Sequence, residues 1–294
     1  MIERVLVVGA SGALGRVIAG KLIDRGGPVR GMSRDPARLD DLTARGAEAV
    51  RGDLRMPETL VNACAGMTQI VSTANSFAGA DATSPTRVDV PGYRALLEAA
   101  RASGVRRIVH ISAHGVTRES PVDYFRVKAE VDDLIRRSGI PCVLVRPSAF
   151  LDAWAGMGLT EASAGRPARV FGDGCRVANY IAIADVAEFA VRILAARDLV
   201  NDEIDVGGPS TLSQNELIDL VEKGRGQPVR RQRLPRPVLQ VGAVLLRPFN
   251  ERLARLMALG AWSAGCDRRL DHWPRAADRF GLQPMTAEAF LASP

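Results

Sequence analysis

The sequence lacks the features that mark membrane, secreted and metal-binding proteins. No apolar stretch reaches the ~18 residues that suggest a membrane-spanning helix. The N-terminal region has no basic segment, long apolar segment or cleavage site, so we expect a cytoplasmic protein. The four cysteines, Cys64, Cys142, Cys175 and Cys266, have no paired spacing, and the three histidines form no ligand pattern with them. The sequence therefore predicts neither a disulfide framework nor a metal site.

Lysine is scarce as well. Of 39 basic residues, only Lys21, Lys128 and Lys223 are lysines. A position that carries lysine instead of arginine is therefore a candidate for a specific role. The formal net charge of +6 could suit a nucleic acid. The arginines are spread over the whole chain, however, and are not gathered beside interleaved aromatic residues. We therefore expect no nucleic-acid partner.

The first half of the chain alternates short apolar segments with helical ones. Apolar residues recur at helical spacing from Leu14 to Leu22, and Tyr93–Ser103 is rich in alanine and leucine. Such alternation predicts an α/β fold, a Rossmann-type doubly wound parallel sheet with helices on both faces. The predicted strands are Arg4–Val8, Val29–Met32, Ala47–Arg51, Gln69–Thr73, Arg107–Ser112 and Pro141–Arg146.

After residue 150 the rhythm changes. The stretch Tyr180–Ala196 indicates a strand edge that runs into a helix opened by Asp185, and Glu203–Val206 indicates one further strand. The last third consists of helical pieces broken by prolines. We predict a dinucleotide-binding domain over residues 1–150, to which 177–206 return, and a smaller, mostly helical substrate lobe formed by 151–176 and 207–294.

Three glycines follow the first predicted strand in "VVGASGALG", residues 7–15. Gly9 would permit a tight turn, Gly12 would let a pyrophosphate approach the backbone, and Gly15 would allow close packing of helix on strand. Phosphate would then bind at the N-terminus of the following helix. The spacing G-x-x-G-x-x-G departs from G-x-G-x-x-G, and a plain strand-to-helix turn is the alternative. The predicted cofactor loop comprises Gly9, Ser11, Gly12, Ala13, Leu14 and Gly15.

The segment "GMSRDPAR" follows the second predicted strand, where NAD and NADP are distinguished. Ser33 and Arg34 occupy this position, and an arginine there accommodates the 2′-phosphate of NADP. We therefore predict NADP(H); the adjacent Asp35 leaves use of NAD(H) open, and a solvated arginine is the alternative. In "RGDL", Asp53 with Leu54 would lie at the rim of an adenine pocket, although a loop-capping role explains Asp53 nearly as well.

One lysine lies on the apolar face of a predicted helix. In "VDYFRVKAEVDDLIRRSG", helical spacing brings together Tyr124, Val127, Lys128, Val131, Leu134 and Ile135. Burying an unpaired ammonium is costly, which implies a polar partner or a cleft. A snorkelling lysine beside a core tyrosine is the alternative.

A Tyr-x-x-x-Lys pair can assist a reduction. The ammonium of Lys128 would lower the pKa of the Tyr124 phenol, which could then pass a proton to a carbonyl oxygen as hydride reaches the carbon. Lys128 could also hold the nicotinamide ribose. Ser112, at the end of the preceding strand, could orient the oxygen, or could be an ordinary strand-end residue.

Together these segments resemble the atypical short-chain dehydrogenase/reductases, in particular the NmrA-like NAD(P)-binding group. The resemblance covers residues 4 to about 206 and rests on "VVGASGALGR", "GMSRDPARL", "RGDL", "ALLEAARASGVRRIVHISAHGV", "YFRVKAEVDDLIRRSGIPCVLVRP" and "YIAIADVAEFA". It implies a substrate bound between the sheet and the smaller lobe. It also implies that NADP(H) is held by Gly9, Gly12, Gly15, Arg34, Asp53 and Lys128.

The group contains reductases of quinones, carbonyls and plant phenolic compounds, as well as nucleotide-sensing regulators and assembly factors. Many members lack the catalytic tyrosine, whereas Tyr124 and Lys128 are both present here. Our leading hypothesis is an NADPH-dependent reductase of a carbonyl or quinone-like small molecule. The alternative is a non-catalytic redox-sensing regulator or complex-assembly factor.

The expected substrate is a small apolar or aromatic molecule. Its pocket wall could include Phe150, Trp154, Met157 and Phe171, although such residues more often form core. Arginines flank an apolar run within residues 228–260, which suggests an amphipathic segment that rests on a membrane surface or lines a route for lipophilic substrates. A helix packed within its lobe is the interpretation that we favour, so we do not expect a membrane partner. The sequence does not indicate an oligomeric state.

Overall fold

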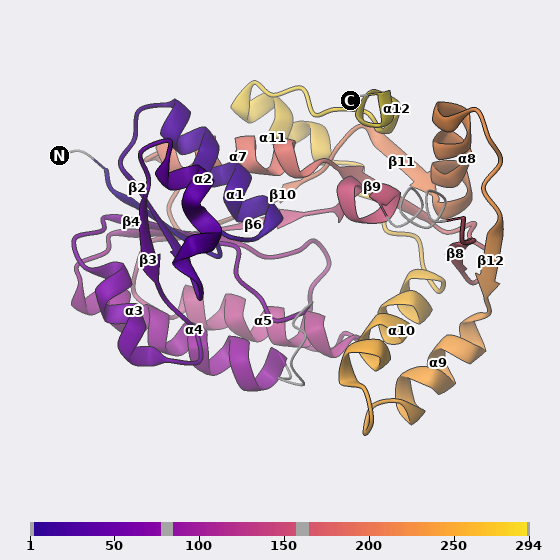
Figure 1. Cartoon of the computed structure of the whole chain (residues 1–294), viewed down its shortest axis with the longest axis horizontal. Coiled ribbons are helices and arrows are strands. Elements are labelled where there is room, and N and C mark those ends of the chain that lie inside the picture. Colours follow the sequence, from indigo (N-terminus) through magenta and orange to yellow (C-terminus); the bar gives the residue numbers. More distant parts are fainter. Residues whose placement is uncertain (1–2, 78–84, 157–164, 293–294) are drawn as a thin grey trace. The chain divides into compact units, whose positions relative to one another are not determined.

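The computed structural model describes residues 3–77, 85–156 and 165–292. Contacts divide the chain into two compact units. Figure 1 shows the whole chain, coloured by residue number. The first unit comprises Met1–Ser120, Tyr124–Arg146 and Val186–Ile204, and the second comprises Pro121–Asp123, Pro147–Asp185 and Asp205–Pro294.

A seven-stranded sheet forms the centre of the first unit, in the order β10-β6-β5-β4-β1-β2-β3. All pairs from β3 to β6 are parallel. The strand order reverses between β1 and β4, and ligands of such sheets bind at the carboxyl edge beside this point. The strands are β1 (Val5–Val8), β2 (Val29–Ser33), β3 (Glu48–Arg51), β4 (Gln69–Ser72), β5 (Arg107–Ile111), β6 (Cys142–Pro147) and β10 (Asp202–Val206).

Helices cover both faces of this sheet. Figure 1 shows α3, α4 and α5 on one face and α1 and α7 on the other. The core beneath α3 and α4 includes Leu6, Ile70 and Leu144, all nearly inaccessible to solvent. The helices are α1 (Ala13–Asp24), α2 (Asp40–Thr43), α3 (Pro57–Cys64), α4 (Pro85–Ala102), α5 (Asp123–Arg136) and α7 (Ile183–Ala195), with a 3-10 turn, η1 (Pro36–Leu39). The predicted doubly wound α/β fold is thus confirmed.

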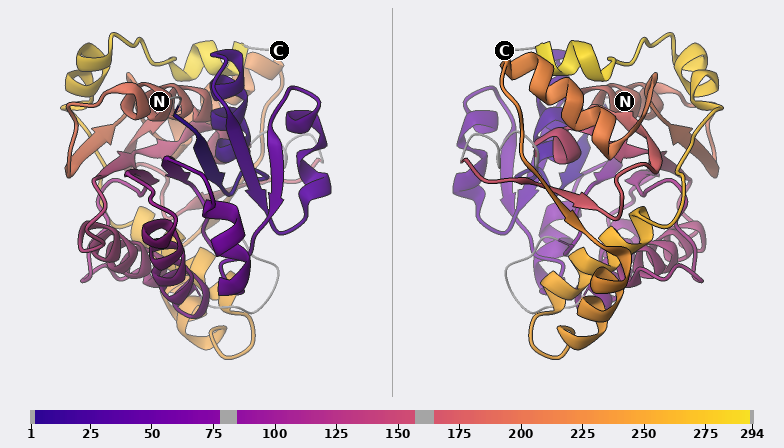
Figure 2. Two further views of the ribbon diagram at one scale, coloured as in Figure 1. Left: turned by 90° about the vertical axis from the view of Figure 1, so that its left-hand side faces the viewer. Right: turned by 90° about the vertical axis from the view of Figure 1, so that its right-hand side faces the viewer.

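The second unit holds two small sheets besides its helices, seen from two further sides in Figure 2. One sheet has the order β11-β9-β7, and the other pairs β12 with β8. Its strands are β7 (Ala149–Phe150), β8 (Ala168–Phe171), β9 (Val177–Ile181), β11 (Ser210–Ser213) and β12 (Arg231–Leu234). Its helices are α8 (Gln214–Arg225), α9 (Arg236–Leu245), α10 (Glu251–Ser263), α11 (Trp273–Phe280) and α12 (Ala287–Ala292).

The predicted return to the nucleotide domain at residue 177 is wrong. Strand β9 pairs with β11 and β7 in the second unit, and the chain rejoins the first unit only at Val186. The apolar residues of β9 therefore fill the second unit's core, in which Tyr180 is almost fully buried.

Within the described ranges, no helix is long and apolar enough to cross a membrane.

Candidate functional site

The glycine loop joins β1 to α1 at the carboxyl edge of the sheet. Gly9 has a φ of +89°, which favours glycine, and a Cβ there would lie 2.8 Å from Thr73 Oγ1. A Cβ on Gly15 would collide with the carbonyl oxygen of Gly9, whereas one on Gly12 would lie 3.3 Å from that oxygen. Close backbone packing therefore requires glycine at positions 9 and 15.

Helix α1 begins without a side-chain cap. Its N-cap is Gly12, the first turn carries no acidic residue, and both Gly12 and Ala13 are exposed. The first amide groups of a helix lack carbonyl partners within it, and their dipoles favour an anion. Ser11 beside them and Leu14 in the first turn are half-buried. This cradle of small residues fits the pyrophosphate of a dinucleotide.

The end of β2 presents an arginine for which the described residues supply no hydrogen bond or close ion pair. Arg34 is exposed and Ser33 is buried, and the Ser33 hydroxyl accepts a hydrogen bond from the backbone N–H of Asp35 at 3.3 Å. The Asp35 carboxylate accepts from the N–H of Ala37 and caps η1. Asp35 thus has a local structural role, and Arg34 is the exposed charge at this position.

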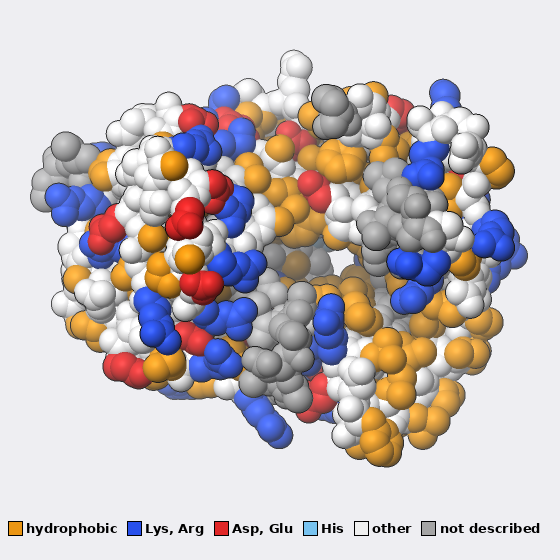
Figure 3. Space-filling model, in the orientation of Figure 1, with side chains coloured by type: hydrophobic (Ala, Val, Ile, Leu, Met, Phe, Trp, Pro, Cys, Tyr) orange, Lys and Arg blue, Asp and Glu red, His pale blue; other side chains and the backbone are white. Residues whose placement is uncertain are grey.

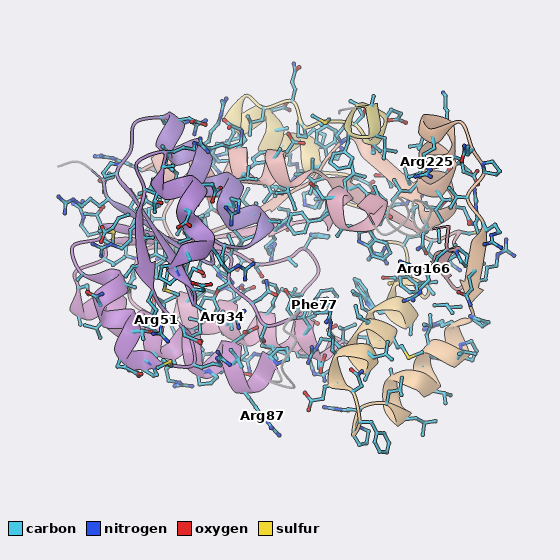
Figure 4. The ribbon with its side chains drawn as sticks, in the orientation of Figure 1. Arg34, Arg51, Phe77, Arg87, Arg166 and Arg225 are labelled. Carbon is cyan, nitrogen blue, oxygen red and sulfur yellow. The ribbon has the colours of Figure 1, made fainter. Side chains whose placement is uncertain are left out.

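Sequence reasoning missed a second arginine beside Arg34. Arg51 is the last residue of β3, and it lies directly opposite Ser33 in the β2–β3 register. It is exposed, and Figure 4 shows it near Arg34, at the ends of neighbouring strands. Its position at the start of "RGDL", where the third predicted strand ends, was a usable signal, because adjacent parallel strands end at the same edge of a sheet.

Asp53 follows β3 and is held by its own loop. Arg55 donates to both carboxylate oxygens at 2.7–3.1 Å and, with lesser help from Arg34, holds the pKa of Asp53 below its usual range. Leu54 packs against Gly92 of α4, where a Cβ would lie 2.6 Å from the leucine Cβ. The local contacts match the loop-capping alternative, and an adenine contact of Asp53 stays a prediction.

Lys128 is buried on α5, as its place on the apolar stripe predicted. Its side chain donates to the carbonyl oxygen of Ile111, at the end of β5, over 3.1 Å. The ammonium nitrogen lies 5.6 Å from the centroid of the Tyr124 ring. Burial lowers the pKa of Lys128, and the nearby carboxylates of Asp132 and Asp89 oppose this shift.

Tyr124 is the one tyrosine of the three that is not buried. Tyr93 and Tyr180 are each 2% exposed, and burial raises the pKa of both phenols. Tyr124 is half-buried and packs against Phe77, with ring centroids 4.6 Å apart. Figure 4 shows Phe77 beside the start of α5. Tyr124 is therefore the tyrosine whose phenol a substrate could reach.

Asp132 lies one turn after Lys128 and was missed by sequence reasoning. It is 1% exposed and accepts a hydrogen bond from the Ser112 hydroxyl at 2.6 Å. The Nε2 atom of His110 lies 3.6 Å from its other oxygen. Burial raises the pKa of Asp132, while the Ser112 hydrogen bond and the Lys128 charge lower it. Its i+4 spacing from Lys128 was a signal that could have found it.

Ser112 is bound to Asp132 in this arrangement, and its role in orienting a substrate oxygen stays a prediction. Ser112 is 3% exposed, and its hydroxyl proton is directed at Asp132 rather than toward a ligand. His110 is buried beside it, and burial together with the Lys128 charge lowers the pKa of its imidazole well below the usual value. Ser112, His110, Lys128 and Asp132 thus form a buried polar cluster, in which the Lys128 ammonium faces the Tyr124 ring.

The predicted pocket-wall residues lie in the second unit. Trp154 and Phe171 pack edge to face at 6.0 Å, and Trp154 belongs to the margin of that unit's core. Phe150 is half-buried on β7, and Met157 lies outside the described residues.

Asp185, expected to open a helix, lies in the first turn of α7. Its carboxylate accepts a hydrogen bond from the backbone N–H of Met285 at 2.8 Å.

Comparisons with known proteins agree with this geometry. Residues 9–197 match the family model described as "NAD(P)H-binding". The (4-alkanoyl-5-oxo-2,5-dihydrofuran-3-yl)methyl phosphate reductase of Streptomyces griseus is 31% identical over 231 residues, 78% of this chain and 77% of that protein. Photosystem II assembly factor Ycf39 of Cyanophora paradoxa is 27% identical over 237 residues, 81% of this chain and 73% of the relative.

Among solved structures, the NADPH-dependent quinone oxidoreductase QOR2 of Escherichia coli, complexed with NADPH, has a TM-score of 0.77 at 20% identity, with 98% of each chain covered. That likeness supports the fold. The glycine cradle and the family match agree on a nicotinamide dinucleotide, NAD(P)H, as the cofactor, and the exposed Arg34 suits the 2′-phosphate of NADP(H). The chain belongs to the NAD(P)H-binding family.

Proposed function

We propose that the protein reduces a carbonyl or quinone-like small molecule with NADPH. The observation that carries this proposal is the half-buried Tyr124 above the buried ammonium of Lys128. A nucleotide-binding scaffold needs no such pair, because burying an ammonium is costly and a tyrosine beside it adds nothing to phosphate binding. The reductase named among the relatives supports the same class of reaction.

The cofactor, when bound, supplies a hydride to the substrate carbon. The protein's part is to provide the proton. The positive charge of Lys128, 5.6 Å from the centroid of the Tyr124 ring, favours the phenolate that forms as the phenol passes its proton to the substrate oxygen. The hydrogen bond of Lys128 to Ile111 fixes the ammonium at the end of β5.

The buried polar cluster sets the charge of Lys128 in this proposal. Asp132 favours the ammonium form against the burial that lowers its pKa. Ser112 in turn donates to Asp132, so we assign Ser112 a positioning role rather than contact with substrate. NADP(H) is held by the glycine loop, with Arg34 and Arg51 at the 2′-phosphate.

The test uses purified protein, NADPH and a panel of quinones, azo compounds and unsaturated carbonyls. We expect NADPH consumption with at least one of these, and Tyr124→Phe should lower kcat by about 10²-fold or more, the range of general acid catalysis. NADPH affinity should be unchanged in that variant. Tyr180→Phe, which alters a buried tyrosine of the second unit, serves as the matched control and should retain activity.

The second candidate is a nucleotide-binding assembly factor, favoured by the similarity to Ycf39. It predicts NADPH binding without turnover of any panel compound, and a Tyr124→Phe variant that behaves as wild type. Equal turnover in Tyr124→Phe and wild type would instead refute the proposed proton donor while leaving reduction intact.

A further inference from the structure

Helices α9 and α10 form a hairpin with an exposed apolar face. The two helices pack closely, since a Cβ on Gly242 would lie 2.5 Å from the sulfur of Met257, and Leu239 is 1% exposed. Other apolar side chains point outward, with Val244 71% and Phe249 86% exposed. We define the exposed apolar face as Val238, Val241, Val244, Leu245, Phe249, Leu253 and Leu256.

This concentration is specific to the hairpin. The described residues include ten large apolar side chains that are exposed, and seven of them belong to the exposed apolar face. The other three, Met56, Val61 and Val200, are scattered singly, as is normal on protein surfaces. Figure 3 shows apolar atoms gathered over the hairpin. A contiguous patch of this kind marks an interaction surface.

The charges around the exposed apolar face are mainly positive. The hairpin, residues 236–263, contains four arginines and a single acidic residue, Glu251. Arg247 and Arg252 flank Phe249 at the end of the hairpin, are exposed, and make no ion pair or hydrogen bond with the described part of the chain. Arg255 points inward and pairs with Asp123 over 3.5 Å, so it does not contribute to the surface charge.

Against the expectation from the sequence, which favoured a helix packed within its lobe, we propose that the hairpin docks on an anionic lipid bilayer, with Phe249 and Leu245 inserted at the headgroup boundary. Apolar side chains enter the interface while the long stems of Arg247 and Arg252 let the guanidinium groups reach lipid phosphates. No described helix could span a bilayer, so the segment lies on the surface. A second copy of the chain is a poorer occupant, because a symmetric contact would bring the arginines of both copies together.

The test is flotation of the purified protein with two kinds of vesicle, phosphatidylcholine alone and phosphatidylcholine with about one third phosphatidylglycerol. We expect flotation with the anionic vesicles and its loss as salt rises, because exposed charges are screened. Phe249→Glu combined with Leu245→Glu should weaken binding at least tenfold. Val61→Glu, at a similarly exposed valine of α3, is the matched control and should float as wild type does.

Two further measurements keep the proposal falsifiable. NADPH binding by the double variant should equal that of wild type, which shows that the variant is folded. A Phe249→Trp variant carries a tryptophan at the proposed insertion point. Brominated lipids should therefore quench a larger share of its tryptophan fluorescence than of the wild-type protein's. The proposal would be overturned if wild-type protein stayed at the bottom of the gradient with anionic vesicles at low salt. It would also be overturned if the double variant floated as well as wild type. A concentration-dependent dimer that Phe249→Glu abolishes would overturn it as well.

Discussion

The two arginines at the ends of β2 and β3 define a testable cofactor preference. Arg34 and Arg51 occupy neighbouring strand ends, and both are exposed. A hydrogen bond to a charged group contributes about 1.5–3 kcal/mol, or roughly 10- to 100-fold in affinity. We expect Arg34→Ala and Arg51→Ala each to weaken NADPH by such a factor and to leave NADH little changed.

Calorimetric titration with both nucleotides measures this directly. Arg101→Ala, at an exposed arginine in the last turn of α4, is the control and should bind both nucleotides as wild type does. If NADPH and NADH weakened in parallel in Arg51→Ala, Arg51 would not read the 2′-phosphate.

Asp132 gives a prediction about pH. Burial lowers the pKa of Lys128, and the carboxylate of Asp132 opposes that shift. If Lys128 must be protonated to support Tyr124, activity falls as pH rises through the pKa of Lys128. Asp132→Asn removes the opposing charge, so the pKa of Lys128 falls further. The alkaline limb of kcat/KM should therefore move to lower pH.

The neighbouring Asp133 provides the control for this pH profile. Asp133 pairs with Arg118 and Arg136 at the surface, and hydrogen bonds and charges from these arginines keep the pKa of its carboxyl low. Asp133→Asn should leave the alkaline limb in place. A uniform loss of activity at every pH in Asp132→Asn would mean that Asp132 acts only on structure.

At the scale of elements, the sequence predicts a helix or strand best where one face of the element, or all of it, is buried. The core strands β1, β4, β5 and β6 are short apolar runs, and their positions were predicted to within one or two residues. β11 and β12 were missed because "STLS" and "RQRL" show no apolar run, and their pairing depends on partners distant in sequence. Such strands are decided by tertiary context rather than by local pattern.

Helix boundaries show the same limit. The sequence predicted a helix from Tyr93, but α4 begins at Pro85 and includes Pro91. Its first turns carry polar residues and prolines, which local propensity counts against a helix. In the candidate site, Lys128 was found because it interrupts an apolar stripe. Asp132 was missed because its hydrogen-bond donor, Ser112, comes from another element.

At the scale of the whole molecule, the two units are interleaved in sequence. The chain passes from the first unit to the second and back, and both α7 and β10 contain residues of both. Loss of structure in one unit would therefore disrupt elements that the other needs. We expect the chain to unfold in one transition, although the predicted nucleotide contacts lie in the first unit alone.

A ligand that binds only the folded state stabilises it by mass action, by about 2.7 kcal/mol at a hundredfold excess over Kd. NADPH at that excess should therefore raise the midpoint of the whole thermal transition, by on the order of 5 °C. Scanning calorimetry with and without NADPH measures this, and Arg34→Ala at the same NADPH concentration should show a smaller rise. Two transitions, of which NADPH moves only one, would show instead that the interleaved units unfold independently.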